Sequence, residues 1–146
     1  VKGFVACDPR ADLVLLSLEK EWPVEPLPIT NAKPRLGDDV FAIGSPRGLA
    51  ETVTRGIVSQ FRVAADIGKN DLAATTKIIQ TDAFTTHGNS GGPLCDAKGR
   101  VIGINTFGLD EDKNVNFAIS HEELARLLQK AGDRVRPLAE LPRVSK

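Results

Sequence analysis

Six short segments typical of β-strands follow one another along most of the chain, and this series is the strongest constraint on its fold. They cover residues 40–44, 51–61, 75–81, 92–96, 100–107 and 115–120. Clusters of Gly, Pro, Asn and Asp separate them, as is typical of turns between strands. Six strands of this length predict a small closed β-barrel.

Two further elements flank this series. Residues 12–18 (DLVLLSL) form a short, nearly continuous apolar run, which predicts a strand buried on both faces. After the last segment, Ser120 followed by Glu123 predicts a helix that begins with a capping box, and Gly132 supplies its stop. The apolar stripe of this helix is formed by Leu124, Leu127, Leu128 and Ala131.

The composition excludes several classes of protein. With 146 residues, the chain is long enough for one domain with a sizeable core. Its 19 basic and 19 acidic side chains give a net charge of +0, which gives no reason to expect a nucleic acid or an anionic membrane as a partner. No apolar run is long enough to span a bilayer. Cys7 and Cys95 form neither a disulfide framework nor a metal-ligand spacing, so we expect no metal and no cofactor.

Ser90 lies in a glycine-rich run, THGNSGGPLCD, at residues 86–96. Gly88, Gly91 and Gly92 lie within two residues of this serine, which marks a turn whose backbone bends tightly or admits a ligand closely. The run is either a plain hairpin loop or the turn of a nucleophilic serine, whose backbone N–H groups form an oxyanion hole.

Several stretches resemble the HtrA (Deg) family of trypsin-like serine proteases in their order and spacing. They are DPRADLVLLSLE, LGDDVFAIGSPRGLAETVTRGIVS, IIQTDAFTTHGNSGGPL, and GRVIGINTFG with the NVNFAIS that follows. The resemblance covers residues 8–131, which is nearly the whole chain. The GNSGGP motif is specific because a QTDA segment precedes it and a GINT strand follows it.

The resemblance implies an all-β, chymotrypsin/trypsin-like double β-barrel, of which this chain holds the complete second barrel. Residues 1–20 would be the last portion of the N-terminal barrel, and residues 21–34 the inter-barrel linker. Residues 35–132 would form the C-terminal barrel with one C-terminal helix, and residues 133–146 a tail or linker. The chain is therefore expected to be a fragment of a longer protease.

The resemblance also implies roles for single residues. Ser90 falls on the family's nucleophile, and the amides of Gly88, Asn89 and Ser90 fall on its oxyanion hole. Asp12 falls on the aspartate of the catalytic triad, which orients the histidine and stabilises its charged form. The alternative interpretation of Asp12 is a strand-end carboxylate in water, although an acid that heads so apolar a run is costly without a partner.

The sequence departs from the family pattern at the general base. The family's catalytic histidine lies upstream of the aspartate, and the only histidines here are His87 and His121. His87 flanks the active site without matching the base, and His121 falls in the first turn of the C-terminal helix. Because a serine hydroxyl without its base is a weak nucleophile, we expect the 146-residue chain alone to be inactive.

The resemblance places the primary substrate pocket between the segment before the nucleophile and the strand that follows GINT. Neither segment carries a carboxylate, so a buried Lys or Arg side chain would lack a partner, and we expect cleavage after Val, Ala or Leu. An acidic residue just beyond the strand could fold inward and change this preference. The pocket residues are Phe84, Thr85, Thr86, Thr106, Phe107 and Gly108, and the acidic residues are Asp110, Glu111 and Asp112.

Two functions follow from these expectations. The first is a serine endopeptidase that hydrolyses unfolded or exposed polypeptide through a Ser-His-Asp triad. The second is a non-catalytic pseudoprotease that binds extended peptide beside a strand edge. For the full-length protein, the resemblance implies a homo-oligomer and an extracytoplasmic location such as the periplasm, and it leaves open accessory domains such as PDZ modules.

Overall fold

The computed structural model describes residues 1–21, 23–45, 52–109 and 112–142, and for residues 109, 112 and 113 it describes the backbone alone. The strands are β1 (Gly3–Asp8), β2 (Leu13–Ser17), β3 (Asp39–Gly44), β4 (Thr52–Val63), β5 (Lys77–Thr81), β6 (Pro93–Asp96), β7 (Val101–Leu109) and β8 (Asp112–Ser120). The helices are α1 (His121–Gln129) and the 3-10 helices η2 (Ala64–Ile67) and η3 (Leu138–Glu140). Among the described residues, no helix is both long enough and apolar enough to cross a bilayer.

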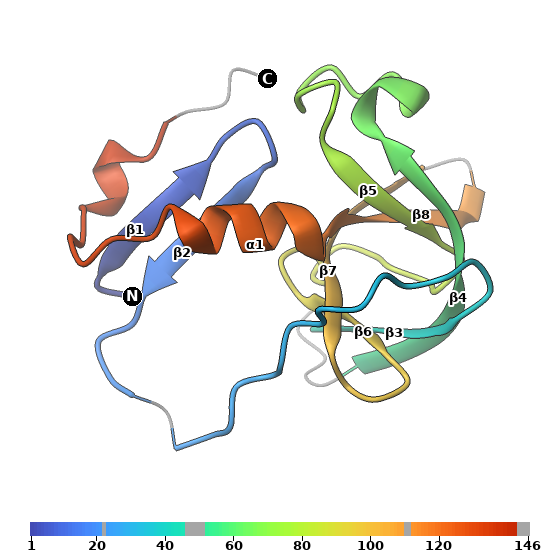
Figure 1. Cartoon of the computed structure of the whole chain (residues 1–146), viewed down its shortest axis with the longest axis horizontal. Helices are drawn as coiled ribbons and strands as arrows, with labels where there is room; N and C mark the ends of the chain where they lie inside the picture. Colours follow the sequence, from blue (N-terminus) through green and yellow to red (C-terminus); the bar gives the residue numbers. More distant parts are fainter. Residues whose placement is uncertain (22, 46–51, 110–111, 143–146) are drawn as a thin grey trace.

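Six of the strands close into a barrel in the order β3-β4-β5-β8-β7-β6 (Figure 1). Each strand pairs antiparallel with both neighbours. Successive side chains of a strand point to opposite faces, so every second residue reaches the interior. Val40 and Ala42 of β3 and Leu94 of β6 are completely buried in this interior. The predicted closed barrel is therefore confirmed.

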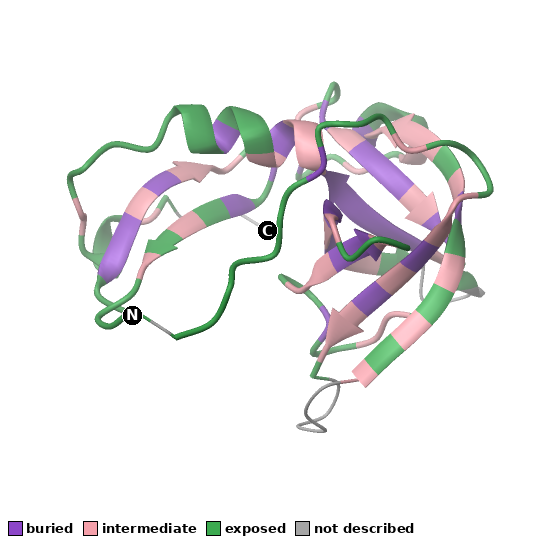
Figure 2. Cartoon of the chain, turned by 60° about the horizontal axis from the view of Figure 1, so that its bottom comes forward, coloured by how far each residue is buried: buried purple, intermediate pink, exposed green. Residues whose placement is uncertain are grey.

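The strands β1 and β2 form a separate two-stranded sheet beside the barrel. The sequence pattern did not predict β1. The prediction that residues 12–18 are buried on both faces is wrong, because Leu13 is buried whereas Val14 and Leu16 are each 43% exposed. One face of the hairpin packs against α1, and Figure 2 shows exposed positions alternating with covered ones along β2.

The helix α1 connects the barrel to this hairpin. The side chain of Ser120 caps its N-terminus by accepting a hydrogen bond from an amide of the first turn. The second half of the predicted capping box is wrong. Glu123 is buried and accepts a hydrogen bond from the backbone N–H of Lys77 at 2.9 Å instead of reaching back to the cap. The helix ends at Gln129, shortly before Gly132.

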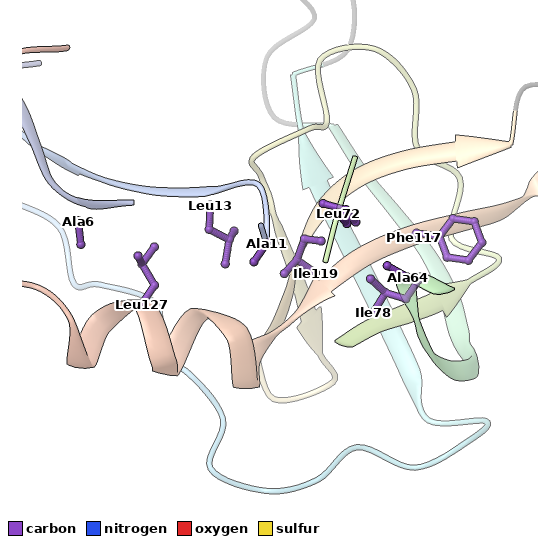
Figure 3. Close-up of a cluster of buried hydrophobic side chains, with 9 residues drawn as sticks. All are labelled: Ala6, Ala11, Leu13, Ala64, Leu72, Ile78, Phe117, Ile119 and Leu127. Carbon is purple, nitrogen blue, oxygen red and sulfur yellow. The ribbon is translucent and has the colours of Figure 1, made fainter. Parts of the chain in front are cut away.

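One hydrophobic cluster extends through the hairpin, the helix and the barrel (Figure 3). The helix α1 contributes the side chain of Leu127, which is 1% exposed, to this cluster. The other buried members come from the hairpin and its turn, from the β4–β5 connection and from the barrel strands: Ala6, Ala11, Leu13, Ala64, Leu72, Ile78, Phe117 and Ile119. Because these side chains share one core, the turn between β1 and β2 is fixed against the barrel.

The segment after α1 returns to the hairpin and pairs with it through an isolated antiparallel bridge. The amide of Phe4 donates to the carbonyl of Arg136 at 2.9 Å, and the amide of Arg136 donates back to the carbonyl of Phe4 at 2.8 Å. The guanidinium of Arg136 also lies 4.2 Å from the centroid of the Phe4 ring. This part of residues 133–146, expected to be a tail or linker, therefore pairs with the edge of β1.

Candidate active site

Ser90 lies on a turn between β5 and β6 that two backbone hydrogen bonds shape. The amide of Asn89 donates to the carbonyl of Thr86 at 3.0 Å, and the amide of Gly92 donates to the carbonyl of Asn89 at 2.9 Å. Gly88 has a φ of 105°, which side-chain-bearing residues rarely adopt. Ser90 itself is exposed. The glycine-rich run is therefore a tight turn that presents its serine to solvent.

The three amides of this turn differ in what they can bind. The amide of Asn89 is already engaged with Thr86. The amides of Gly88 and Ser90 donate no hydrogen bond to any other described residue. Two of the three amides expected to form the oxyanion hole are therefore unengaged by other described residues, and the amide of Asn89 is not.

The hydroxyl of Ser90 donates a hydrogen bond to the carbonyl oxygen of Thr106 at 2.7 Å. The ring of His121 is engaged elsewhere, with its Nδ1 atom 3.2 Å from the carbonyl oxygen of Ile102. Within the described part of the chain, neither His121 nor the exposed His87 forms a hydrogen bond with Ser90. The serine is therefore accessible, and no described imidazole accepts its proton.

Asp12 occupies the turn that leads into β2, and its φ of 54° is left-handed. This region is sparsely populated by residues other than glycine, although Asp and Asn tolerate it best. The residue is exposed as a whole, yet partial desolvation of its carboxyl raises the pKa, the charge of Asp71 raises it further, and Lys69 opposes both. Asp12 does not line the cavity at Ser90. No described hydrogen bond connects the two residues, so the triad role of Asp12 stays a prediction.

A cavity of about 530 Å³ opens beside Ser90. All six residues expected to form the substrate pocket line it: Phe84, Thr85, Thr86, Thr106, Phe107 and Gly108. Two of the lining residues are joined directly, because Oγ1 of Thr85 donates a hydrogen bond to Oδ1 of Asn116 at 2.7 Å. A Cβ atom on Gly108 would lie 2.8 Å from that same oxygen, so a side chain at this position would displace the Asn116 amide.

Of the acidic residues that could have reached into this cavity, Asp110 and Glu111 lie outside the described residues. The same holds for the side chain of Asp112, whose backbone is part of β8. None of the described lining residues is an Asp or a Glu.

Sequence reasoning missed part of the cavity wall. The additional lining residues are Ile67, Lys69, His87, Asn105 and Asn116. Lys69 comes from the connection between β4 and β5, and its Nζ atom lies 4.6 Å from the centroid of the Phe107 ring. The left-handed Gly68, with φ of 66°, signals a turn in this connection. That signal does not reveal which way the turn points Lys69.

Two buried amide side chains lie next to the Ser90 turn. Asn89 and Asn105 are each 2% exposed, and the Oδ1 atom of each has no hydrogen-bond donor among the described residues. The Nδ2 atom of Asn105 donates to the carbonyl of Pro93 at 3.0 Å, and a Cβ atom on Gly44 would lie 2.7 Å from Asn89. The two buried amides therefore pack closely around the turn that carries Ser90.

A second cavity, of about 450 Å³, lies between the linker and the β6–β7 turn. Two ion pairs join charged residues of its lining, Arg35 with Asp38 and Arg100 with Asp96. No Ser, Cys or His lines it among the described residues. Of these two cavities, only the one at Ser90 is lined by a serine or a histidine among the described residues.

The known proteins that this chain resembles are serine proteases. The family model of the trypsin-like peptidase domain matches residues 2–104. The mitochondrial serine protease HTRA2 of Bos taurus is 40% identical over 127 residues, which are 86% of this chain and 27% of that protein. The serine endoprotease DegS of Escherichia coli K12 is 34% identical over 133 residues, which are 86% of this chain and 36% of that protein. The chain thus spans about a quarter to a third of the length of these relatives.

Solved structures agree with the sequence relatives. The serine endoprotease of Yersinia pestis superposes with a TM-score of 0.69 at 35% identity, over 87% of this chain and 42% of that one. The active form of the Rv3671c protease of Mycobacterium tuberculosis superposes with a TM-score of 0.79 at 28% identity, over 92% of this chain and 60% of that one.

Proposed function

The chain belongs to the trypsin-like peptidase domain family, and from that premise we propose that it carries the nucleophile, the oxyanion hole and the primary pocket of an HtrA-type serine endopeptidase. One observation carries this proposal. The exposed Ser90 stands beside a cavity of about 530 Å³, with the amides of Gly88 and Ser90 unengaged by other described residues. An acyl-transfer enzyme needs these three parts together: a nucleophile, donors for the oxyanion, and a pocket that positions the scissile bond.

The proposal gives roles to Ser90, Gly88 and Asp12. Ser90 Oγ attacks the carbonyl carbon of the scissile peptide bond, and the carbonyl oxygen becomes an oxyanion held by the amides of Gly88 and Ser90. Asp12 orients the histidine that takes the proton from Ser90. Neither His87 nor His121 is given that role, because neither forms a hydrogen bond with Ser90 within the described part of the chain. The proposal therefore assigns the general base to no residue of the printed sequence.

The substrate in this proposal is unfolded or exposed polypeptide. The cavity at Ser90 is lined by Phe84 and Phe107 and, within the described residues, by no carboxylate. A Lys or Arg side chain would lose its hydration there without gaining a partner, at a cost of several kcal/mol. An aliphatic side chain has no charge to desolvate, so we expect cleavage after Val, Ala or Leu.

A non-catalytic peptide-binding function is the second candidate, and the hydrogen bond between Ser90 Oγ and the carbonyl of Thr106 favours it. A backbone carbonyl cannot take the serine proton, so the hydroxyl in this arrangement is not activated. A protein that only binds extended peptide has no need of that activation.

Peptide hydrolysis by the protein that contains this chain in full tests the two candidates. We expect cleavage of an unfolded polypeptide such as reduced casein, and Ser90→Ala should abolish it, by roughly 10⁶-fold as for nucleophile removal in other serine proteases. Asp12→Asn should lower kcat by roughly 10⁴-fold, through the wrong histidine tautomer. Ser59→Ala on β4 is the matched control and should leave the rate unchanged. Peptide binding without hydrolysis would favour the second candidate.

A further inference from the structure

The cavity at Ser90 contains one basic side chain that sequence reasoning did not place there. Lys69 is the only Lys or Arg among the described lining residues, and that lining includes no Asp or Glu. Its side chain is 36% exposed, so the ammonium is partly shielded from water. Among the described lining residues, the one Lys, Arg, Asp or Glu side chain is therefore a cation.

The backbone around Lys69 is fixed rather than free. The amide of Lys69 donates to the carbonyl of Ala64 at 3.2 Å, which closes the turn after η2. On one side Ile67 packs against the hydrophobic core, and on the other Leu72 is buried in it. Because Ile67 and Leu72 both pack into the core, the backbone position of Lys69 between them is defined.

The side chain of Lys69 is held as well. Its Nζ atom lies 4.6 Å from the centroid of the Phe107 ring and 3.1 Å from Oδ2 of Asp71. The Phe107 ring is held in turn by Phe117, with the two ring centroids 5.0 Å apart. A cation over an aromatic face is attracted to it, and the attraction grows when water is partly excluded. The ammonium is thus placed against a residue of the pocket wall, while Asp71 does not line the cavity.

We propose that Lys69 is a specificity-determining residue: its ammonium makes the Ser90 pocket discriminate substrate side chains by charge, preferring a carboxylate to a neutral side chain of the same shape and rejecting Lys and Arg. This inference rests on the proposed function, because it takes the cavity as the pocket for the residue before the scissile bond. Aliphatic residues remain acceptable, since they meet the apolar parts of the wall. Among long polar substrate side chains, the pocket prefers Glu to Gln and Gln to Lys.

Glu and Gln have the same shape, so their difference isolates the charge effect. A partly exposed charge pair shifts an equilibrium by up to about fivefold. We therefore expect Glu to be favoured over Gln by about two- to fivefold. Because salt screens partly exposed charges, the preference should shrink as the NaCl concentration rises.

The test measures binding without requiring catalysis. Fluorescein-labelled peptides of one sequence, ending in Val, Glu, Gln or Lys, are titrated into the Ser90→Ala form of the protein that contains this chain in full. Fluorescence anisotropy gives each Kd. In the Ser90→Ala protein we expect the peptide ending in Glu to bind most tightly, then the one ending in Gln, then the one ending in Lys. Adding Lys69→Met should remove the preference for Glu over Gln while Val binding is retained. Adding Lys69→Glu should reverse the order of affinities. Lys98→Met, on the β6–β7 turn at the second cavity, is the matched control and should keep the parent order.

An unchanged order in both Lys69 variants would overturn the inference, and so would failure of all four peptides to bind. The proposed peptidase activity is measured separately, with Ser90 present. A protein that cleaves peptides but does not distinguish Glu from Gln overturns only the role of Lys69. A protein that binds in the expected order but never cleaves overturns only the peptidase proposal.

Discussion

The hydroxyl of Ser90 donates a hydrogen bond to the carbonyl oxygen of Thr106 at 2.7 Å, so the candidate nucleophile is paired with a residue that lines the cavity beside it. A carbonyl accepts a hydrogen bond but is far too weak a base to take the proton. Nucleophilic attack therefore requires the hydroxyl to rotate away from Thr106 towards a general base. While this contact holds, the exposed hydroxyl is paired with an acceptor that does not activate it.

The first prediction concerns the reactivity of the 146-residue chain alone. Because neither His87 nor His121 forms a hydrogen bond with Ser90 in the described part of the chain, we expect no peptide turnover and only slow labelling by a fluorophosphonate. Losing the base removes several orders of magnitude in rate, leaving only what the oxyanion hole and binding provide. Intact-mass spectrometry over time measures the labelling. Rapid stoichiometric labelling of Ser90 would mean that one of these histidines, or water, acts as the base.

The second prediction concerns the cleavage preference of the protein that contains this chain in full. Digestion of a peptide library, read by mass spectrometry, should show dominant cleavage after Val, Ala or Leu, because Phe84 and Phe107 line the pocket and no described carboxylate does. Dominant cleavage after Arg or Lys would contradict the pocket assignment and leave the family assignment intact. In that case an acidic residue such as Asp110 or Glu111 would be the first to test.

The third prediction concerns pH. Nζ of Lys130 donates a hydrogen bond to Oδ2 of Asp8 at 2.8 Å, and this bond lowers the pKa of the Asp8 carboxyl although partial burial opposes it. Because the folded pKa lies below the unfolded one, ionised Asp8 stabilises the fold at pH above about 4, and this stability is lost as the pH falls through the folded pKa.

Lys130→Met should accordingly lower the free energy of unfolding by up to about 1 kcal/mol at neutral pH. The deficit should shrink once acid protonates Asp8 in the parent protein. Urea unfolding of both proteins across the acidic range measures this, with the exposed Lys20→Met as the control. A deficit that stays constant down to the lowest pH would contradict the assignment of the effect to Asp8.

The fourth prediction concerns Glu123, which is buried and accepts the backbone N–H of Lys77 while its other oxygen accepts from Arg126 at 2.8 Å. Glu123→Ala leaves the Lys77 amide without its acceptor, so the free energy of unfolding should fall by about 1–3 kcal/mol. Gln129→Ala, at an exposed position of the same helix, should change it by less than about 0.5 kcal/mol. Chemical denaturation compares the two. Equal effects would show that the buried contact contributes nothing.

Much of the barrel could be predicted because its signals are local. Turn residues such as those of DAKG, where Gly99 has a φ of 73° and its amide donates to the carbonyl of Asp96, separate strands that the sequence shows directly. The resemblance to HtrA proteases is confirmed by relatives such as HTRA2 and DegS. Residues 84–86 and 106–108, which the resemblance implies as the pocket segments, line one cavity with Ser90.

The errors came from contacts between distant parts of the chain. Residues 12–18 form a nearly continuous apolar run, but burial depends on how many elements cover the sheet, and one face of β2 is partly open. Glu123 has the spacing of a capping box, yet the amide of Lys77, distant in sequence, engages it instead. Lys69 reaches the pocket from the β4–β5 connection through a turn whose direction no local pattern specifies.

The most direct test of the central claim, that Ser90 is the nucleophile of a serine peptidase, is active-site labelling of the protein that contains this chain in full. The protein is treated with a fluorophosphonate, digested, and the adduct located by tandem mass spectrometry. We predict one adduct per chain, on Ser90, that is absent in Ser90→Ala and retained in the control Ser59→Ala. No adduct under conditions in which the protein is folded, or an adduct on another residue that persists in Ser90→Ala, would contradict the claim.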